Sequence, residues 1–164
     1  MKDAAVGIIF KDRRRRILIV KRRDVPIWVL PGGGIESNEL PEEAVVREFQ
    51  EETGLRVVVV RKIAEYTPLN RLGQTVHLFE VAVIGGTPTI NCEAKAIGFH
   101  PIDNLPIPFF SLHAKWVEDA LKEERNIIKS PLPITYKIAL TYAFKHPVLA
   151  IRWCLARLGI PINR

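Results

Sequence analysis

Short runs rich in apolar and β-branched residues recur along the chain, a pattern typical of β-strands. These stretches cover residues 4–10, 17–21, 28–30, 57–63, 76–84 and 97–100. Several strands in a chain of this length predict a sheet with at least one face buried.

Two helices are predicted among these strands. The first begins at Pro41, which is followed by two acidic residues, and ends at Gly54. Proline and acids favour a first helical turn, and a glycine beyond the last turn can adopt the left-handed conformation that ends a helix. The second covers residues 111–126, before prolines 131 and 133. Strands with interspersed helices predict a sheet covered by helices, which the pattern alone leaves as α/β or α+β.

The size of the chain predicts one domain. It has 164 residues, of which 48% are hydrophobic, enough for one sizeable core but not for two. The N-terminal residues lack the order of a signal peptide, and no apolar run reaches the length of a membrane span, so we expect a cytoplasmic protein. Cys92 and Cys154 have no spacing that indicates a disulfide framework or a zinc site, and we expect both in the core.

The formal net charge of +6 favours anionic partners: nucleotides, nucleic acid or an anionic lipid surface. Much of it lies in residues 13–16, all arginine, and in residues 21–23. We interpret the four arginines as a solvated turn that leads into a strand. Nucleic acid is the weaker alternative, because no aromatic residues interleave with these charges as they do in proteins that bind single strands.

Glycines and carboxylates concentrate around the first predicted helix. Glu48, Glu51 and Glu52 are related as i, i+3 and i+4, so they fall on one stripe of that helix. Carboxylates on one stripe repel one another unless a cation neutralises them, and oxygen ligands without Cys or His favour Mg²⁺ or Mn²⁺. Glycines 32–34 can bring backbone groups close to a metal or a phosphate. An ordinary glutamate-rich surface helix is the alternative.

The complete spacing is more specific than this helix face. The chain resembles the Nudix hydrolase family, because it matches each fixed position of the Nudix box: Gly33, Glu39, Arg47, Glu48, Phe49, Glu51, Glu52, Gly54 and Leu55. The likeness covers residues 4 to about 125. It implies an α/β/α sandwich with a central mixed sheet, the box folded as loop-helix-loop, and a Nudix hydrolase domain over residues 1–130.

The resemblance also implies a metal site. Glu48, Glu51 and Glu52 would hold Mg²⁺, or Mn²⁺ as a substitute, and the backbone carbonyl of Gly32 or Gly33 would be a further ligand. The expected reaction is hydrolysis, by a metal-activated water, of a pyrophosphate bond in a nucleoside diphosphate linked to another group.

The remaining catalytic roles follow from the same resemblance. Arg47 would orient the glutamates, and Glu39 would be its other carboxylate partner. One carboxylate, on this helix face or supplied by a loop, would act as the base. A Nudix-fold nucleotide-binding or regulatory protein without catalytic activity is the alternative.

Candidate substrate contacts lie outside the helix. Lys21 or Arg22, at the end of a strand, would meet a phosphate, and Trp28 would either stack on a base or pack in the core. Glu80 interrupts an apolar strand face, so it points into the site or lies at an exposed strand edge. Glu93 occupies a position where many relatives place a carboxylate near the metal, with an ordinary exposed acid as the alternative.

The group attached to the diphosphate stays open. The signature of NADH-cleaving relatives is absent, and no tyrosine lies where the diadenosine polyphosphate hydrolases place theirs. Pro68 lies close to the position associated with ADP-ribose cleavage, whereas nucleotide sugars and nucleoside triphosphates are the alternatives. Histidines 77, 100, 113 and 146 form no ligand cluster, and we predict structural roles for them.

Residues 131–164 form a basic, apolar extension that we expect to be helical and not an independent domain. The segment has five basic residues and no acid: Lys137, Lys145, Arg152, Arg157 and Arg164. We interpret it as an extra helix that packs on the domain or at a homodimer contact. Peripheral contact with an anionic membrane surface is the alternative.

Overall fold

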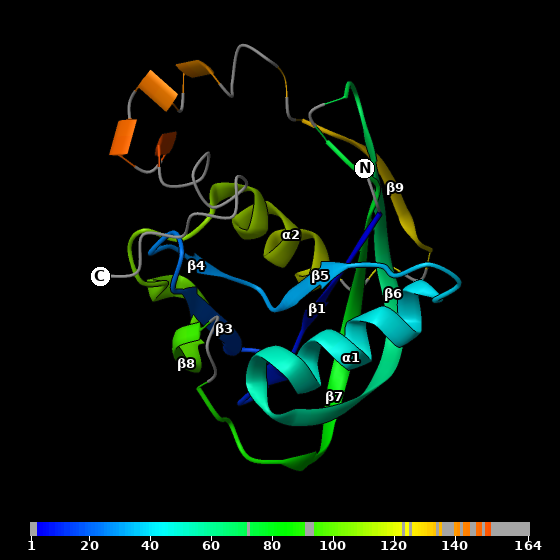
Figure 1. The fold of residues 1–164 in the computed structure, drawn as a ribbon. Coiled ribbons are helices and arrows are strands. Elements are labelled where there is room, and N and C mark those ends of the chain that lie inside the picture. The colour runs from blue at the N-terminus through cyan, green and yellow to red at the C-terminus, as the bar shows by residue number, and fades with distance from the viewer. Residues whose placement is uncertain are drawn as a thin grey trace.

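The computed structural model describes residues 3–71, 73–90, 94–122, 124, 126–133, 135, 140–141, 143–144, 147–148 and 150–151. Its elements follow one another in the order β1 (Ala4–Ile8), β2 (Phe10–Lys11), β3 (Arg16–Arg22), β4 (Trp28–Val29), β5 (Gly32–Gly34), α1 (Pro41–Thr53), β6 (Leu55–Pro68), β7 (Val76–Gly86), β8 (Ala94–Pro101), a 3₁₀ turn (Ile102–Asn104), α2 (Ser111–Leu121) and β9 (Ile128–Leu132) (Figure 1). All six predicted strand regions and both predicted helices are therefore present. The second helix is shorter than predicted.

The strands form two sheets. The larger has the order β5-β1-β7-β6-β9, in which β1 is parallel to β7 and β9 is parallel to β6, while the other neighbours are antiparallel. In the smaller sheet, β3 pairs with β2, β4 and β8. The predicted mixed sheet is confirmed.

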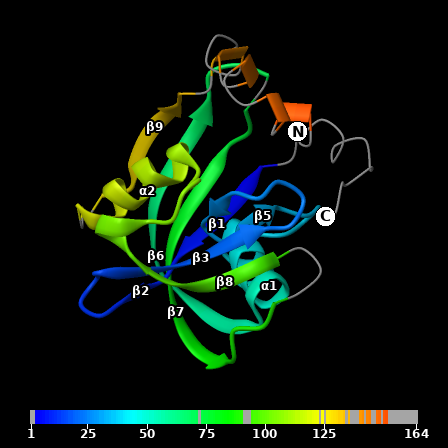
Figure 2. The ribbon, with the colours of Figure 1, turned by 90° about the vertical axis from the view of Figure 1, so that its left-hand side faces the viewer.

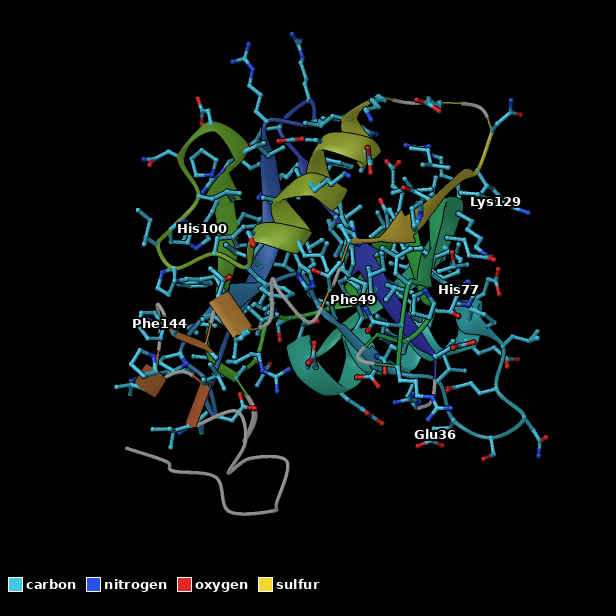
Figure 3. All side chains as sticks on the ribbon, turned by 90° about the horizontal axis from the view of Figure 1, so that it is seen from above. Glu36, Phe49, His77, His100, Lys129 and Phe144 are labelled. Carbon is cyan, nitrogen blue, oxygen red and sulfur yellow. The ribbon has the colours of Figure 1, made fainter. Side chains whose placement is uncertain are left out.

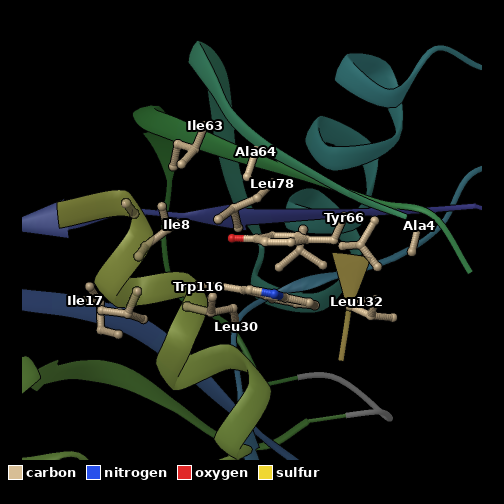
Figure 4. Close-up of a cluster of buried hydrophobic side chains, with 14 of the residues drawn as sticks. Ala4, Ile8, Ile17, Leu30, Ile63, Ala64, Tyr66, Leu78, Trp116 and Leu132 are labelled. Atoms are coloured by element: carbon tan, nitrogen blue, oxygen red, sulfur yellow. The ribbon is translucent and has the colours of Figure 1, made fainter. Parts of the chain in front are cut away.

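The two helices cover opposite sides of the strands (Figures 1 and 2). Successive residues of a strand point to opposite faces, so Leu78 and Phe79 of β7 belong to two different core clusters. Phe79 packs in the cluster that contains Phe49 of α1. Leu78 packs in the other cluster, where Trp116 of α2 stacks on Tyr66 (Figure 4). This arrangement is the predicted α/β/α sandwich.

Both ends of α1 are fixed by the residues that predicted them. Pro41 occupies the first helical position, and the Glu43 carboxylate accepts the Leu40 N–H at 2.9 Å. Gly54 has a φ of +72°, and its N–H donates to the Gln50 carbonyl at 3.1 Å. The local signals therefore place α1 correctly, and with it the glutamates on its surface.

The turn of four arginines is only partly solvated. Arg13 and Arg15 are exposed, as predicted. Arg14 lies over the Phe10 ring, 3.9 Å from its centroid, and donates to Glu80 at 2.7 Å. The interpretation of a solvated turn is therefore wrong for Arg14, because the Glu80 carboxylate draws its guanidinium onto the domain.

The core continues into the predicted extension. Leu132, the last residue of β9, is 2% exposed within the cluster beneath α2. The predicted domain boundary after residue 130 falls inside β9, because this strand pairs with residues 64–68 of β6. Described positions farther along, at 140–141, 143–144, 147–148 and 150–151, have helical backbone.

Some predictions concern residues outside the described part of the chain. These are the burial of Cys92 and Cys154, the substrate contact of Glu93, and the structural role of His146. Among the described residues, no helix is long and apolar enough to cross a membrane. The cytoplasmic location stays a prediction.

Candidate active site

The glycines of β5 allow α1 to lie close to the sheet. Gly32 has a φ of +147°, and a Cβ there would collide with the Ala5 carbonyl of β1. A side chain at this position would therefore push β5 off the edge of the sheet. From this position, the Gly32 N–H donates to Glu52 Oε2 at 3.0 Å. The loop and the helix thus meet at one of the predicted ligands.

Gly33 provides space for a second carboxylate. A Cβ at Gly33 would lie 2.5 Å from Cδ and Oε1 of Glu48, so that carboxylate occupies the volume that a side chain would fill. At Gly34, by contrast, a Cβ would meet nothing within 4 Å. The missing side chain therefore matters at Gly33, where it lets the Glu48 carboxylate lie against the backbone of the loop.

Arg47 connects the loop before α1 with the glutamates on the helix. Its Nε and Nη2 donate to the two carboxylate oxygens of Glu39 at 2.8 and 2.9 Å. Its Nη1 donates to Glu48 at 2.8 Å and to Glu51 at 3.2 Å, and Nη2 also donates to the Gly34 carbonyl at 2.9 Å. Hydrogen bonds with Glu39, and then with Glu48, raise the pKa of Arg47, so its guanidinium stays charged.

These contacts are the ones predicted for Arg47. A guanidinium is planar and presents several donors in a fixed arrangement, so bonding to Glu39, Glu48 and Glu51 at once restricts the directions in which their carboxylates can point. Its charge also offsets the repulsion between Glu48 and Glu51. Its catalytic role stays a prediction.

The donor set on α1 fits a hard divalent cation. Three carboxylates lie on one helical stripe beside the glycine loop, and carboxylate and carbonyl oxygens are the ligands that Mg²⁺ prefers. As the side chains stand, no group of three acidic, His or Cys residues in the described part of the chain converges on one point. Arg47 holds Glu48 and Glu51, whereas Glu52 turns toward Gly32. For these oxygens to converge on one ion, the glutamate side chains would have to adopt other rotamers.

A cavity of about 350 Å³ is lined in part by Glu39. Carboxylates line it at Asp3, Glu36 and Glu39, and its described lining contains no Lys or Arg. His77 also lines it, and burial, with Lys62 nearby, lowers the pKa of this histidine. The cavity therefore repels a pyrophosphate, and we do not assign the substrate to it.

Lys21 and Trp28 lie together on the β3–β4 ladder. They are paired residues, and Lys21 Nζ lies 5.8 Å from the centroid of the Trp28 ring. Trp28 is partly buried and also contacts His100 edge to face at 4.8 Å. Arg22, by contrast, is bound by both carboxylate oxygens of Asp24, at 2.9 and 2.6 Å. Of the two basic candidates, the geometry favours Lys21 for contact with an anionic ligand.

Glu80 lies on the side of the sheet opposite α1. Its strand partner Ile8 belongs to the cluster beneath α2. The Glu80 carboxylate accepts from Arg14 at 2.7 Å and from Arg61 at 2.8 Å, and both arginines also donate to the Ala120 carbonyl in α2. Glu80 is therefore neither at an exposed strand edge nor beside the α1 glutamates. The structure does not support it as a substrate contact.

His113 is a residue of this region whose particular role the sequence did not reveal. It is 9% exposed, and its Nδ1 accepts the Leu30 N–H at 2.9 Å. Burial, with Arg22 nearby, lowers its pKa to about 3, so the imidazole is neutral. The bond ties α2 to the segment that leads into the glycine loop. Its spacing from Leu30, 83 residues along the chain, gives no local signal.

Comparison with known proteins agrees with this architecture. Residues 1–120 match the family model described as NUDIX domain. The chain is 38% identical over 125 residues to an ADP-ribose pyrophosphatase of Methanocaldococcus jannaschii, covering 73% of this chain and 72% of the relative. It is 31% identical over 118 residues to a MutT-like protein of Streptomyces ambofaciens, covering 72% and 75%.

A solved structure supports the same assignment. The chain superimposes on the crystal structure of an ADP-ribose pyrophosphatase from Streptococcus suis with a TM-score of 0.64 and 25% sequence identity, covering 79% of this chain and 98% of that one. The family match, the α/β/α sandwich and the complete Nudix box support the same family assignment. The chain belongs to the Nudix family and is a hydrolase of the kind that acts on phosphorus-containing anhydrides.

Proposed function

We propose that this hydrolase is a Mg²⁺-dependent pyrophosphohydrolase that cleaves a nucleoside diphosphate linked to another group, with ADP-ribose as the first candidate substrate. The observation that carries the proposal is the seating of Glu48 and Glu52 against the glycine loop while Arg47 orients Glu48 and Glu51. ADP-ribose is favoured because two similar proteins are ADP-ribose pyrophosphatases, and because Pro68 lies close to the position associated with ADP-ribose cleavage.

Glu48, Glu51 and Glu52 would hold Mg²⁺, or Mn²⁺ in its place, together with the carbonyl of Gly32 or Gly33. When bound, such an ion makes water more acidic and offsets the negative charge that develops on the phosphate oxygens.

The chain's own groups would perform the remaining work. Arg47 would limit the rotation of Glu48 and Glu51, and the Gly32 N–H would do the same for Glu52, once the carboxylates have turned toward the ion. One carboxylate would accept the proton of the attacking water. Lys21 would meet a phosphate of the substrate, and Trp28 beside it would offer an aromatic face to the base.

The test is a panel of compounds incubated with the protein and Mg²⁺ or Mn²⁺, followed by identification of the products. The panel contains ADP-ribose, nucleotide sugars and nucleoside triphosphates. We expect ADP-ribose to yield AMP and ribose 5-phosphate. Turnover of nucleoside triphosphates alone would contradict the substrate proposal, and no turnover of any compound would favour a binding or regulatory protein instead.

Removal of the metal gives a second test. We expect EDTA to abolish turnover while the thermal midpoint of unfolding hardly changes, because the two core clusters are built without the glutamates on the α1 stripe. Activity should return when Mg²⁺ is added in excess of the chelator. Full turnover in EDTA would contradict the metal-dependent mechanism.

A further inference from the structure

The described part of the C-terminal extension exposes large apolar side chains. These are Leu140, Phe144, Val148 and Ile151, all at helical positions. Leu140 and Phe144 are related as i and i+4, and Val148 and Ile151 as i and i+3, so each pair lies on one side of a helical turn. Phe144 is 88% exposed. Figure 3 shows it on the orange segment near the edge of the molecule, whereas Phe49 of the core lies near the centre.

The same segment carries most of the net charge of the protein. Residues 131–164 contain five Lys or Arg and no Asp or Glu, so five of the six net positive charges belong to them. The preceding 130 residues are therefore nearly neutral as a whole. Apolar side chains open to solvent and an excess of cations thus occur together in a single short segment.

We propose that residues 140–151, with the basic residues around them, bind the surface of an anionic lipid bilayer. Exposed apolar side chains at helical positions, with cations near them in the sequence, suit the boundary between headgroups and acyl chains, where apolar groups leave water and cations meet lipid phosphates. The charge distribution selects this partner over a second copy of the same segment, because two copies would each bring five positive charges and no negative ones.

The proposed surface is separate from the hydrolase site. The orange segment lies apart from α1 in both ribbon views (Figures 1 and 2). Binding would hold the enzyme at a membrane without occupying the carboxylate face of α1. Membrane binding and turnover should therefore be separable by substitution.

The experiment is cosedimentation of the full chain with lipid vesicles. One set contains phosphatidylcholine and phosphatidylglycerol, and the other contains phosphatidylcholine alone. We expect binding to the anionic vesicles to be at least ~10-fold stronger at low ionic strength and to weaken as salt is added. Phe144→Ser should reduce the binding at least ~10-fold and leave both turnover and the thermal midpoint unchanged, because this side chain makes little contact with the domain.

Ile107→Ser is the matched control. Ile107 is 92% exposed but belongs to the loop before α2, so its replacement should leave vesicle binding unchanged. Equal binding by the parent and by Phe144→Ser, or binding that ignores lipid charge, would overturn the proposal. It would also be overturned if the parent bound no vesicles and Phe144→Ser converted a dimer to a monomer, since the extension would then be a contact between copies.

Discussion

At the scale of single residues, the spacing between loop and helix depends on the absence of side chains at two adjacent glycines. Gly32 is constrained by the backbone of β1, whereas Gly33 is constrained by the Glu48 carboxylate. The two constraints differ physically. A backbone atom cannot move without disturbing the sheet, but the end of a glutamate side chain can rotate away. A substitution at Gly33 should therefore affect the proposed metal site and leave the fold intact.

We predict that Gly33→Ala raises the Mg²⁺ concentration required for half-maximal turnover ~10-fold, because the new methyl group displaces the Glu48 carboxylate. The free energy of unfolding should change by less than about 1 kcal/mol, since the φ of Gly33 is not in the left-handed region. Gly34→Ala is the matched control, because a Cβ there meets nothing within 4 Å. Equal Mg²⁺ dependence in the two variants would show that the position of Glu48 does not govern metal affinity.

Glu52 allows a test of charge at nearly constant shape. In Glu52→Gln the amide oxygen can still accept the Gly32 N–H, so the thermal midpoint should stay the same or rise as repulsion on the stripe decreases. An amide is a poor ligand for a hard cation, and we expect kcat to fall by at least ~10²-fold. Glu42→Gln makes the same change at an exposed position in the first turn of α1 and should keep its activity. Glu52 would be excluded from the site if its variant turned over within a few-fold of the parent.

Whether a contact could be predicted depends on how far apart its partners lie in the sequence. The contact of Arg47 with Glu51 follows from helical spacing, because the two residues are related as i and i+4. The contacts of Glu80 could not be predicted, because its partners Arg14 and Arg61 lie 66 and 19 residues away. An acid on an apolar strand face looks the same in sequence whether it faces a substrate or two arginines, and only the packing of α2 on the sheet distinguishes these cases.

At the scale of elements, α1 could be predicted from signals in its own sequence, whereas the strands β5 and β9 could not. The signals that place α1 are contained in its own ends, at Pro41 and Gly54. β5 consists of three glycines and therefore has no apolar alternation. β9 contains Pro131, which is tolerated because the strand lies at the edge of its sheet. Both strands exist because a neighbouring strand offers hydrogen bonds, which is information from the fold and not from the segment.

His113, which accepts the Leu30 N–H and so joins α2 to the segment before the glycine loop, should make the free energy of unfolding depend on pH. His113 is neutral in the folded protein and has a pKa of about 3 there, against 6.5 for an ordinary histidine. Between these values the unfolded chain binds a proton that the folded chain does not. Stability is therefore lost as the pH falls below 6.5, by up to about 1.4 kcal/mol per pH unit from this group.

We predict that His113→Asn flattens this dependence, because an amide oxygen can accept the Leu30 N–H but does not titrate near neutral pH. The variant should be less stable than the parent at pH 7, since it loses the stacking of His113 on Trp116. The measurement is urea unfolding of both proteins from pH 7 to pH 5, in which the contributions of the other histidines cancel. Parallel pH profiles would show that His113 is not the titrating group.

At the scale of the whole molecule, the packed core extends past the residue at which the composition of the chain changes. The change to a basic, acid-free sequence predicted a boundary after residue 130. The core nevertheless includes Leu132, which packs with Tyr66 and Trp116 in the cluster beneath α2 (Figure 4). The charge composition of a segment reflects mainly its exposed side chains, whereas the extent of the core depends on which side chains are buried. In this chain the charge composition changes after residue 130, but burial continues to Leu132.

Two truncations, one after Pro133 and one after residue 130, should therefore behave differently. The first keeps all of β9, so we expect turnover and the urea midpoint to stay close to those of the full chain, with only the proposed vesicle binding lost. The second removes the pairing of β9 with Thr67 and Pro68 and empties the site of Leu132. Loss of a buried leucine costs about 2–5 kcal/mol, which the urea midpoint would report. Leu132→Ala in the full chain is the matched control, and it should show a comparable loss.

Equal stability of the two truncated proteins would place the end of the domain at residue 130 after all. Loss of turnover in the longer one, with its fold intact, would instead show that residues 134–164 contribute to the hydrolase site.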